Sequence, residues 1–373
     1  MLFEKLEMRT GREGKGTLVI PNRFMRSATY EGIAAKDGSM TPQLEAEMEK
    51  LAAHHVGLVV FSYFFTEECG RAAPFQLSLA TDAAAESCRA AVEKVHARGS
   101  VCVAQICHAG IAGIVEKMGP SGSEKLGIRE MTLEDIARTV RAFGECARRA
   151  KAVGFDMVMM HAAHGYLLSQ FLDGQTNRRT DAYGGSLENR ARVLREVARE
   201  MRSAVGPDYP LAVKMNVDDG HEGGITVPES TQVALWLAED GIDLFEASCM
   251  SPIKPATAGT CYNRAGAESW RQALKARFPH AVVALVGGMR KQQECEECLR
   301  AGACDLVSLS RPFIREPDLV DLWAACPAHD GTAKCVSCNA CLRNAFKGKF
   351  MCAFNDPERH APATTTTTTT VQQ

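Results

Sequence analysis

The chain has 373 residues, 46% of them hydrophobic and 24% charged, a balance typical of globular proteins and not of disordered or fibrous ones. Lys and Arg number 43 and Asp and Glu 45, so the net charge of −2 argues against nucleic acid or an anionic membrane as a partner. The longest apolar run, from Val56 to Phe65, is too short for a membrane span of roughly 17–25 residues, and the acidic start does not resemble a signal peptide, so we expect a cytoplasmic protein.

Eight short apolar runs alternate with longer amphipathic segments along the chain. The runs are Phe24–Ala28, Leu58–Phe61, Val101–Ile106, Met157–His161, Leu211–Asn216, Leu244–Ala247, Val282–Val286 and Leu306–Leu309. Several are continuously apolar, as is typical of parallel strands that helices cover on the outside. Between them, Thr132 with Asp135, and the capping-box pattern Thr226-Val-Pro-Glu229, indicate helix starts.

This alternation predicts an α/β fold, a (β/α)8 TIM barrel. The rival, a doubly wound sheet, would usually bring a glycine-rich phosphate loop after its first strand, and neither G-x-G-x-x-G nor a Walker A sequence is present. We expect the barrel over residues 1–327, a short cysteine-containing extension over 328–360 and a low-complexity tail over 361–373. Most of the fifteen cysteines stand singly in apolar or helical stretches, which favours buried free thiols in a reducing compartment.

The segment after the fourth run carries the strongest functional signal. It reads His161-Ala-Ala-His164-Gly-Tyr166 and continues to Asn177-Arg-Arg-Thr-Asp-Ala-Tyr-Gly-Gly-Ser-Leu-Glu-Asn-Arg190. Side chains at the carboxyl ends of barrel strands face the active site, so two histidines and a tyrosine at this spacing can converge on one pocket. A lone histidine at a strand end is more often structural, but the three residues together favour catalysis.

This segment closely resembles the signature of the old yellow enzyme family of flavin-linked ene-reductases, and in particular its 2,4-dienoyl-CoA reductase branch; weaker similarity extends from Asn22 to Leu319. The resemblance implies an FMN-dependent oxidoreductase that uses NAD(P)H to reduce activated C=C bonds. It implies that His161 and His164 hold an oxygen of the unsaturated substrate, that flavin N5 delivers hydride to the β-carbon and that Tyr166 protonates the α-carbon. A phenol with a pKa of about 10 keeps its proton at neutral pH and can serve as that acid.

The resemblance also implies which residues hold FMN. Ser27, Ala28, Thr29 and Tyr30 would border the isoalloxazine ring; Gln105 would bind its pyrimidine edge; Lys214 would lie beside N1 and O2; and Gly287, Gly288, Ser310 and Arg311 would bind the phosphate. Judged from the residues alone, Gln105 could instead cap a loop. Lys214 could instead form an ion pair with a carboxylate at a strand end, because buried lysine is rare unless it is paired.

Four cysteines form a separate pattern near the end of the chain. Cys335, Cys338, Cys341 and Cys352 resemble the iron–sulfur motif of the dienoyl-CoA reductase and trimethylamine dehydrogenase branch, although the second and third are one residue closer together here. Four thiolates suit a [4Fe–4S] cluster or zinc, and free thiols are the third alternative. No second flavin and dinucleotide domain follows them in this sequence, so we expect a cluster to use an external electron donor or to be structural.

Three departures from the family pattern leave the substrate open. Ile111 replaces an arginine, Tyr63 stands where small residues are common near the flavin, and the stretch from Ala247 to Pro252 lacks a histidine. One rival function is amine oxidation or demethylation that passes electrons to the cluster; another is a non-catalytic flavin-binding redox sensor, which would not need His161, His164 and Tyr166. The sequence also leaves open NADH against NADPH and whether the chain forms a homo-oligomer.

Overall fold

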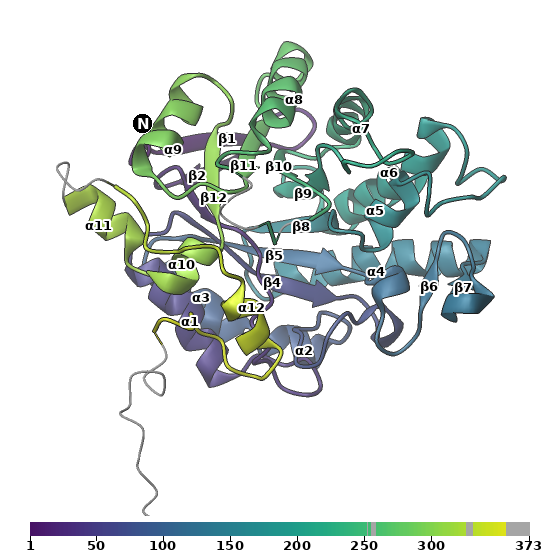
Figure 1. The fold of residues 1–373 in the computed structure, drawn as a ribbon, viewed down its shortest axis with the longest axis horizontal. Coiled ribbons are helices and arrows are strands. Elements are labelled where there is room, and N and C mark those ends of the chain that lie inside the picture. Colours follow the sequence, from purple (N-terminus) through teal and green to yellow (C-terminus); the bar gives the residue numbers. More distant parts are fainter. Residues whose placement is uncertain (252, 255–258, 326–330, 356–373) are drawn as a thin grey trace, which may run out of the picture.

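Eight parallel strands close into a barrel at the centre of the molecule (Figure 1). The computed structural model describes residues 1–251, 253–254, 259–325 and 331–355. The barrel strands are β3 (Phe24–Arg26), β4 (Leu58–Phe65), β5 (Val101–Cys107), β8 (Met157–Ala162), β9 (Leu211–Asn216), β10 (Leu244–Ser248), β11 (Val282–Val286) and β12 (Leu306–Leu309). They follow one another around the barrel in chain order, and β12 pairs with β3 to close it. The predicted (β/α)8 barrel is confirmed, with a strand at each of the eight apolar runs.

Helices surround this barrel on the outside (Figure 1). The α-helices of the described residues are α1 (Pro42–Ala53), α2 (Asp82–Glu86), α3 (Arg89–Ala97), α4 (Leu133–Ala152), α5 (Leu167–Leu172), α6 (Leu187–Val205), α7 (Val227–Glu239), α8 (Arg264–Arg277), α9 (Gln292–Arg300), α10 (Arg311–Arg315), α11 (Leu319–Ala325) and α12 (Ala340–Ala345). None of them is both long enough and apolar enough to cross a membrane.

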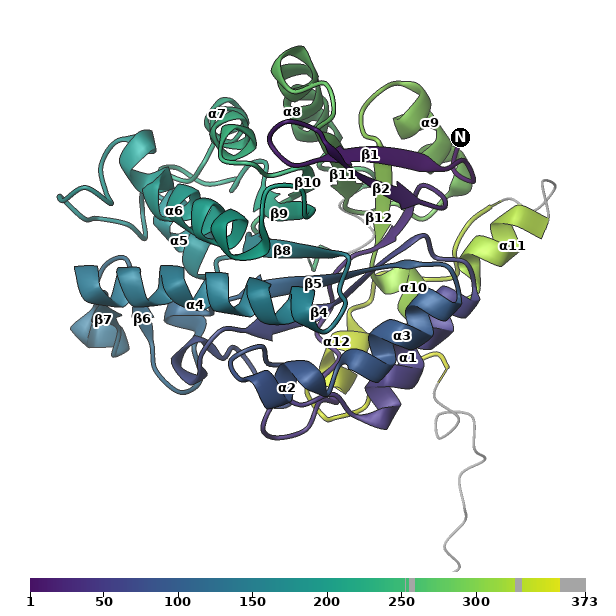
Figure 2. The same ribbon diagram turned by 180° about the vertical axis from the view of Figure 1, so that it is seen from behind.

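The inside of the barrel is apolar at the amino ends of the strands. Inward side chains such as Met25, Val103, Met159, Ala212 and Leu244 form one buried cluster there. An antiparallel hairpin of β1 (Leu6–Thr10) and β2 (Gly16–Ile20), which the sequence analysis did not predict, adds Met8 and Ile20 to the same cluster and covers this end. Figure 2 shows the hairpin in dark purple beside β11 and β12.

The inward positions become polar two residues further along the same strands. Ser27, Gln105, His161, Lys214, Glu246 and Ser308 are the side chains at that level. Because side chains alternate between the two faces of a strand, each of them points to the same face as an apolar residue of the cluster below. The carboxyl end of the barrel is therefore built as a buried polar floor.

Two other segments differ from the expected alternation of barrel strands and helices. Strand β4 runs past the expected end at Phe61, because the chain makes an irregularity at Ser62 and Tyr63 and then pairs again with β5 through Phe64 and Phe65. A small parallel pair, β6 (Met118–Gly119) and β7 (Arg129–Glu130), lies in the loop before α4.

The cysteine-containing segment folds back onto the barrel, with α12 beside α10 (Figure 1). The approach is close at Gly32, where a Cβ would lie 2.1 Å from the carbonyl oxygen of Ala345. The expected boundary at residue 327 and the low-complexity tail over 361–373 lie outside the described residues.

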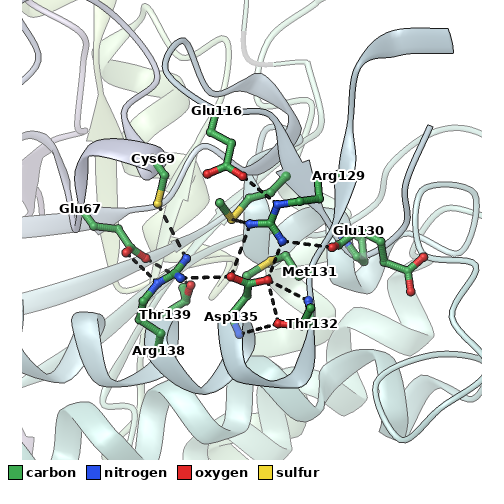
Figure 3. A network of polar contacts seen from close by, with 12 residues as sticks. Glu67, Cys69, Glu116, Arg129, Glu130, Met131, Thr132, Asp135, Arg138 and Thr139 are labelled. Carbon is green, nitrogen blue, oxygen red and sulfur yellow. Dashed lines mark hydrogen bonds and ion pairs between the residues drawn. The ribbon is translucent and has the colours of Figure 1, made fainter. Parts of the chain in front are cut away.

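Both predicted helix starts are confirmed. Thr132 caps α4 in a reciprocal capping box with Asp135, and Thr226 is the N-cap of α7, where its backbone N–H donates to Glu229 Oε2 at 3.0 Å. Asp135 of the first box also binds two arginines: its carboxylate lies 2.6 Å from Arg129 Nη1 and 3.0 Å from Arg138 Nη1 (Figure 3). Hydrogen bonds from Arg129 and then from Thr132 lower the pKa of Asp135.

We predict that Asp135→Asn destabilises the protein by about 1–2 kcal/mol at neutral pH, because it removes two ion pairs and the charge that strengthens the capping-box hydrogen bond. The folded pKa of this carboxyl is lowered, so its contribution is present above the unfolded value of about 3.9 and disappears as pH falls through the folded value. Urea unfolding of both proteins across that range measures the difference. Glu134→Gln, an exposed change in the same helical turn, is the control and should shift stability by a few tenths of a kcal/mol at most.

Candidate active site

A cavity of about 340 Å³ opens at the carboxyl end of the barrel. Every residue that the sequence analysis assigned to catalysis or to FMN lines it: Ser27, Ala28, Thr29, Tyr30, Gln105, His161, His164, Tyr166, Lys214, Gly287, Gly288, Ser310 and Arg311. They come from the ends of six different strands and their loops, as expected of an active site in this fold.

The two histidines and the tyrosine form one aromatic cluster. The ring centroid of His161 lies 5.0 Å from that of His164 and 5.1 Å from that of Tyr166. Strand β8 supplies His161; His164 then takes a left-handed backbone conformation with φ of 62°, and Tyr166 stands at the start of α5. This turn brings three side chains within six positions of the sequence to one wall of the cavity.

Burial fixes the protonation of this cluster. It lowers the pKa of His161 and of His164 well below the usual 6.5, and the positive charge of Lys214 adds to the effect. Burial raises the pKa of Tyr166 to about 12. At neutral pH the site therefore presents two neutral imidazoles and one protonated phenol, a set that can bind an oxygen atom and donate a proton.

Tyr63 is a fourth member of the cluster. Its hydroxyl oxygen lies 3.4 Å from that of Tyr166, and the two ring centroids are 5.6 Å apart. The sequence analysis noted Tyr63 only as a departure from the family pattern. The irregularity in β4 turns it into the cavity, where it touches the proposed acid.

Two buried polar side chains in the cavity wall lack good partners within the described chain. Gln105 is 1% exposed, and its Nε2 meets only the weak acceptor Sδ of Met159, at 3.0 Å. His161 is 3% exposed, and neither of its ring nitrogens makes a hydrogen bond to the described residues. Buried polar groups are normally satisfied, so both indicate a bound polar ligand. The amide of Gln105 fits the heteroaromatic edge that the family resemblance implies.

Lys214 makes the ion pair that was the alternative interpretation of this residue, and it also lines the cavity. Its Nζ lies 3.4 Å from the carboxylate of Glu246 on the neighbouring strand and donates a hydrogen bond of 2.7 Å to Ser27 Oγ. The two interpretations are therefore compatible, because one face of the ammonium meets Glu246 and the side chain still borders the cavity.

The loops after β11 and β12 form the end of the cavity expected to hold phosphate. Gly287 has a φ of 136°, and a Cβ there would lie 2.6 Å from the ring of Tyr262, so only glycine fits. Among the described residues, nothing accepts a hydrogen bond from the main-chain N–H groups of Gly287 and Gly288, so this part of the chain leaves them available to an anion. Nη1 of Arg311 is already bonded to the carbonyl of Lys254 and to Asn339 Oδ1. The rest of that guanidinium is the part available to a phosphate.

The four clustered cysteines line a second, smaller cavity that adjoins the first. Cys335, Cys338, Cys341 and Cys352 all border it, and Cys341 borders the larger cavity as well. None of the four is in a disulfide. Ser337 and Asn339, which flank Cys338, both take left-handed backbone conformations, with φ of 54° and 59°. Both turns lie in the segment that places Cys335, Cys338 and Cys341 around this cavity.

Several residues of the site were missed in the sequence. Ser248 accepts or donates a hydrogen bond of 2.8 Å at His164 Nε2, and Glu246 and Ser308 lie in the polar floor. Glu246 carried a readable signal, since an acidic residue inside a strand is as unusual as Lys214. The serines carried none, because serine is common at strand ends for many reasons.

Most of the chain is similar in sequence to a known family of enzymes. Residues 15–324 match the model of the NADH:flavin oxidoreductase / NADH oxidase family. The chain is 32% identical over 346 residues to an NADH oxidase of Thermoanaerobacter brockii, covering 88% of this chain and 52% of that protein. It is 33% identical over 288 residues to an NADPH dehydrogenase of Halalkalibacterium halodurans, covering 76% and 83%.

A solved structure shares the whole described architecture. The complex of 2-naphthoyl-CoA reductase with 2-naphthoyl-CoA superimposes with a TM-score of 0.86 at 27% identity, covering 96% of this chain and 57% of that one. This chain thus spans little more than half the length of the first curated relative and of this reductase.

We predict that neither His161 nor His164 titrates near the usual imidazole pKa of about 6.5. NMR of protein carrying ¹³C-labelled histidine, with His161→Gln and His164→Gln to assign the two signals, measures this directly. Both signals should stay at the neutral position between about pH 5.5 and 8. A midpoint inside that range for either ring would contradict the neutral pair.

Proposed function

The chain belongs to the NADH:flavin oxidoreductase / NADH oxidase family, and from this premise we propose that it is an FMN-dependent enzyme that uses NAD(P)H to reduce an activated C=C bond in a small molecule. The observation that carries the proposal is the convergence of two neutral imidazoles and a protonated phenol on the cavity. A protein that only bound flavin or sensed redox state would not need them. The free cysteines of the described chain support a reducing compartment such as the cytoplasm.

The described residues fit FMN along the length of the cavity. Gln105 and Lys214 would meet the pyrimidine edge, the segment from Ser27 to Tyr30 would border the ring, and the N–H groups of Gly287 and Gly288 with Ser310 and Arg311 would hold the phosphate. When bound, FMN supplies hydride transfer between the nicotinamide and the substrate. NAD(P)H and substrate would alternate in the same cavity, so no separate dinucleotide fold is required.

The chain's own residues then prepare the substrate. His161 and His164 each offer a ring N–H to its carbonyl or similar oxygen, and such bonds polarise the conjugated system and make the β-carbon electrophilic. Because both rings are neutral, they orient the oxygen without adding a full positive charge. Tyr166, kept protonated by burial, is the acid for the α-carbon. A carbonyl-conjugated alkene is the substrate class that uses all three groups.

The second cavity supports a [4Fe–4S] cluster over zinc. Zinc–sulfur bonds of about 2.3 Å would hold four tetrahedral sulfur atoms roughly 3.8 Å apart. Among the described residues, no three of these four sulfur atoms lie within 4.8 Å of one another, whereas a four-iron cluster binds each thiolate at a different iron and needs a wider cage. Cys341 lines both cavities, so a cluster held by the four cysteines would lie next to FMN and would supply one-electron transfer, with a partner protein as the external donor.

We predict that Tyr166→Phe slows oxidation of the reduced enzyme by an enone roughly 10²–10⁴-fold, because the acid is lost, while reduction by NAD(P)H changes by a small factor only. Stopped-flow absorbance of the two half-reactions separates these effects. Tyr183→Phe, which removes a hydroxyl outside the cavity, is the control and should leave both rates unchanged. If Tyr166→Phe slowed both half-reactions equally, or neither, the tyrosine would be a positioning residue and not the acid.

We also predict about four iron and four sulfide per chain after anaerobic purification. Cys338→Ser should remove most of both, whereas Cys88→Ser, which changes a buried thiol at the start of α3, should remove neither. Analysis of iron, sulfide and zinc distinguishes the three alternatives for the four cysteines, which are a [4Fe–4S] cluster, zinc and free thiols. Zinc without iron, or no metal at all, would overturn the cluster assignment.

A further inference from the structure

A buried ion pair lies in the polar floor of the barrel, beneath the cavity. Lys214 of β9 and Glu246 of β10 are direct register partners on adjacent strands. The Nζ atom lies 3.4 Å from both carboxylate oxygens, and the two residues are 3% and 0% exposed. Lys214 lines the cavity, whereas Glu246 does not.

The hydrogen bonds around Glu246 are one-sided. Ser27 Oγ and Ser308 Oγ donate to its Oε1 at 2.6 and 2.7 Å, and Ser27 in turn accepts from Lys214. Its Oε2 has no hydrogen-bond partner in the described chain, and the ammonium is its only compensation. A buried carboxylate is costly unless it is paired, and an apolar pair of the same size would be at least as stable. Stability alone therefore does not account for this carboxylate.

The two charges of the pair have opposite effects on the stability of a reduced flavin bound in the cavity. A lone ammonium against the cofactor would stabilise the reduced flavin, which is the more negative state, and would make it a weaker hydride donor. A carboxylate 3.4 Å from the ammonium, outside the lining of the cavity, offsets part of that field, and charges this deeply buried are screened little by solvent.

We propose that Glu246 is a positioning residue that holds Lys214 and offsets its charge, and thereby keeps the reduction potential of the bound flavin low. The inference rests on the proposed function, since it requires FMN in the cavity. It assigns no proton transfer and no substrate contact to Glu246; the residue acts only through Lys214 and Ser27.

Glu246→Gln tests the proposal, because it keeps the shape and the hydrogen bonds from the serines and removes the charge. The midpoint potential of the FMN-loaded protein, measured by dye-coupled reductive titration, should rise. We expect a shift of the oxidised-to-reduced ratio of tenfold or more, which is about 30 mV for a two-electron couple. Asp243→Asn is the matched control: this buried carboxylate precedes the same strand and pairs with Arg202 at the opposite end, so the potential should stay unchanged.

A second comparison covers the outcome in which Glu246→Gln alone does not fold. Lys214→Gln with Glu246→Gln removes both charges together, so if the carboxylate offsets the ammonium, the potential of this double variant should stay within about 30 mV of the wild-type value. A double-variant potential that falls further below the wild-type value, or an unchanged potential in folded, FMN-loaded Glu246→Gln, would overturn the proposal. A wild-type protein that binds no FMN would instead refute the proposed function, which keeps the two failures distinct.

Discussion

Closing eight parallel strands into a barrel leaves an interior that side chains must fill, and in this chain the filling changes from apolar to polar within one step of two residues. On the inner face of three strands, the next side chain after Met159 is His161, the next after Ala212 is Lys214 and the next after Leu244 is Glu246. Polar groups at that depth are out of reach of bulk solvent, so they need partners from the protein or from a ligand. Lys214 and Glu246 are partners for each other within the protein. For Gln105 and His161, the partner would be a ligand bound in the cavity above them.

The chemistry of the site follows from this depth. Burial keeps His161 and His164 neutral and Tyr166 protonated, and the charge of Lys214 acts in the same direction on the histidines. An exposed copy of the same three side chains would titrate near ordinary values and would lose the neutral oxygen-binding pair in mild acid. The apolar lower half of the barrel and the hairpin that covers it thus have a functional consequence, because they keep water away from the floor of the site.

Much of this could be predicted from the sequence. Parallel strands buried on both sides leave continuous apolar runs, and capping boxes such as Thr226 with Glu229 mark helix starts locally, so both signals survive without tertiary information. The motif from His161 to Tyr166 predicted a shared pocket for the same reason, since its three residues are close in the chain, and all three line the cavity. The family resemblance drawn from that motif is confirmed by the match over residues 15–324.

Two features that could not be predicted from the sequence depend on contacts between distant segments. The hairpin of β1 and β2 is defined by the barrel end that it covers, and the irregularity that turns Tyr63 inward depends on pairing with β5. Glu246 was missed for a different reason. Its strand was treated as an apolar run, although a period of two places Glu246 on the same inward face as Leu244.

If the cavity at the carboxyl end of the barrel holds FMN, as we propose, the chromophore of the purified protein must be FMN. Purified protein should be yellow, and denaturation should release close to one FMN per chain and no FAD. Apoprotein titrated with the two flavins should regain the bound absorption spectrum with FMN at stoichiometric amounts, because we propose that the loop at Gly287 and Gly288 binds a terminal phosphate. Colourless protein that FMN does not reconstitute would contradict the account.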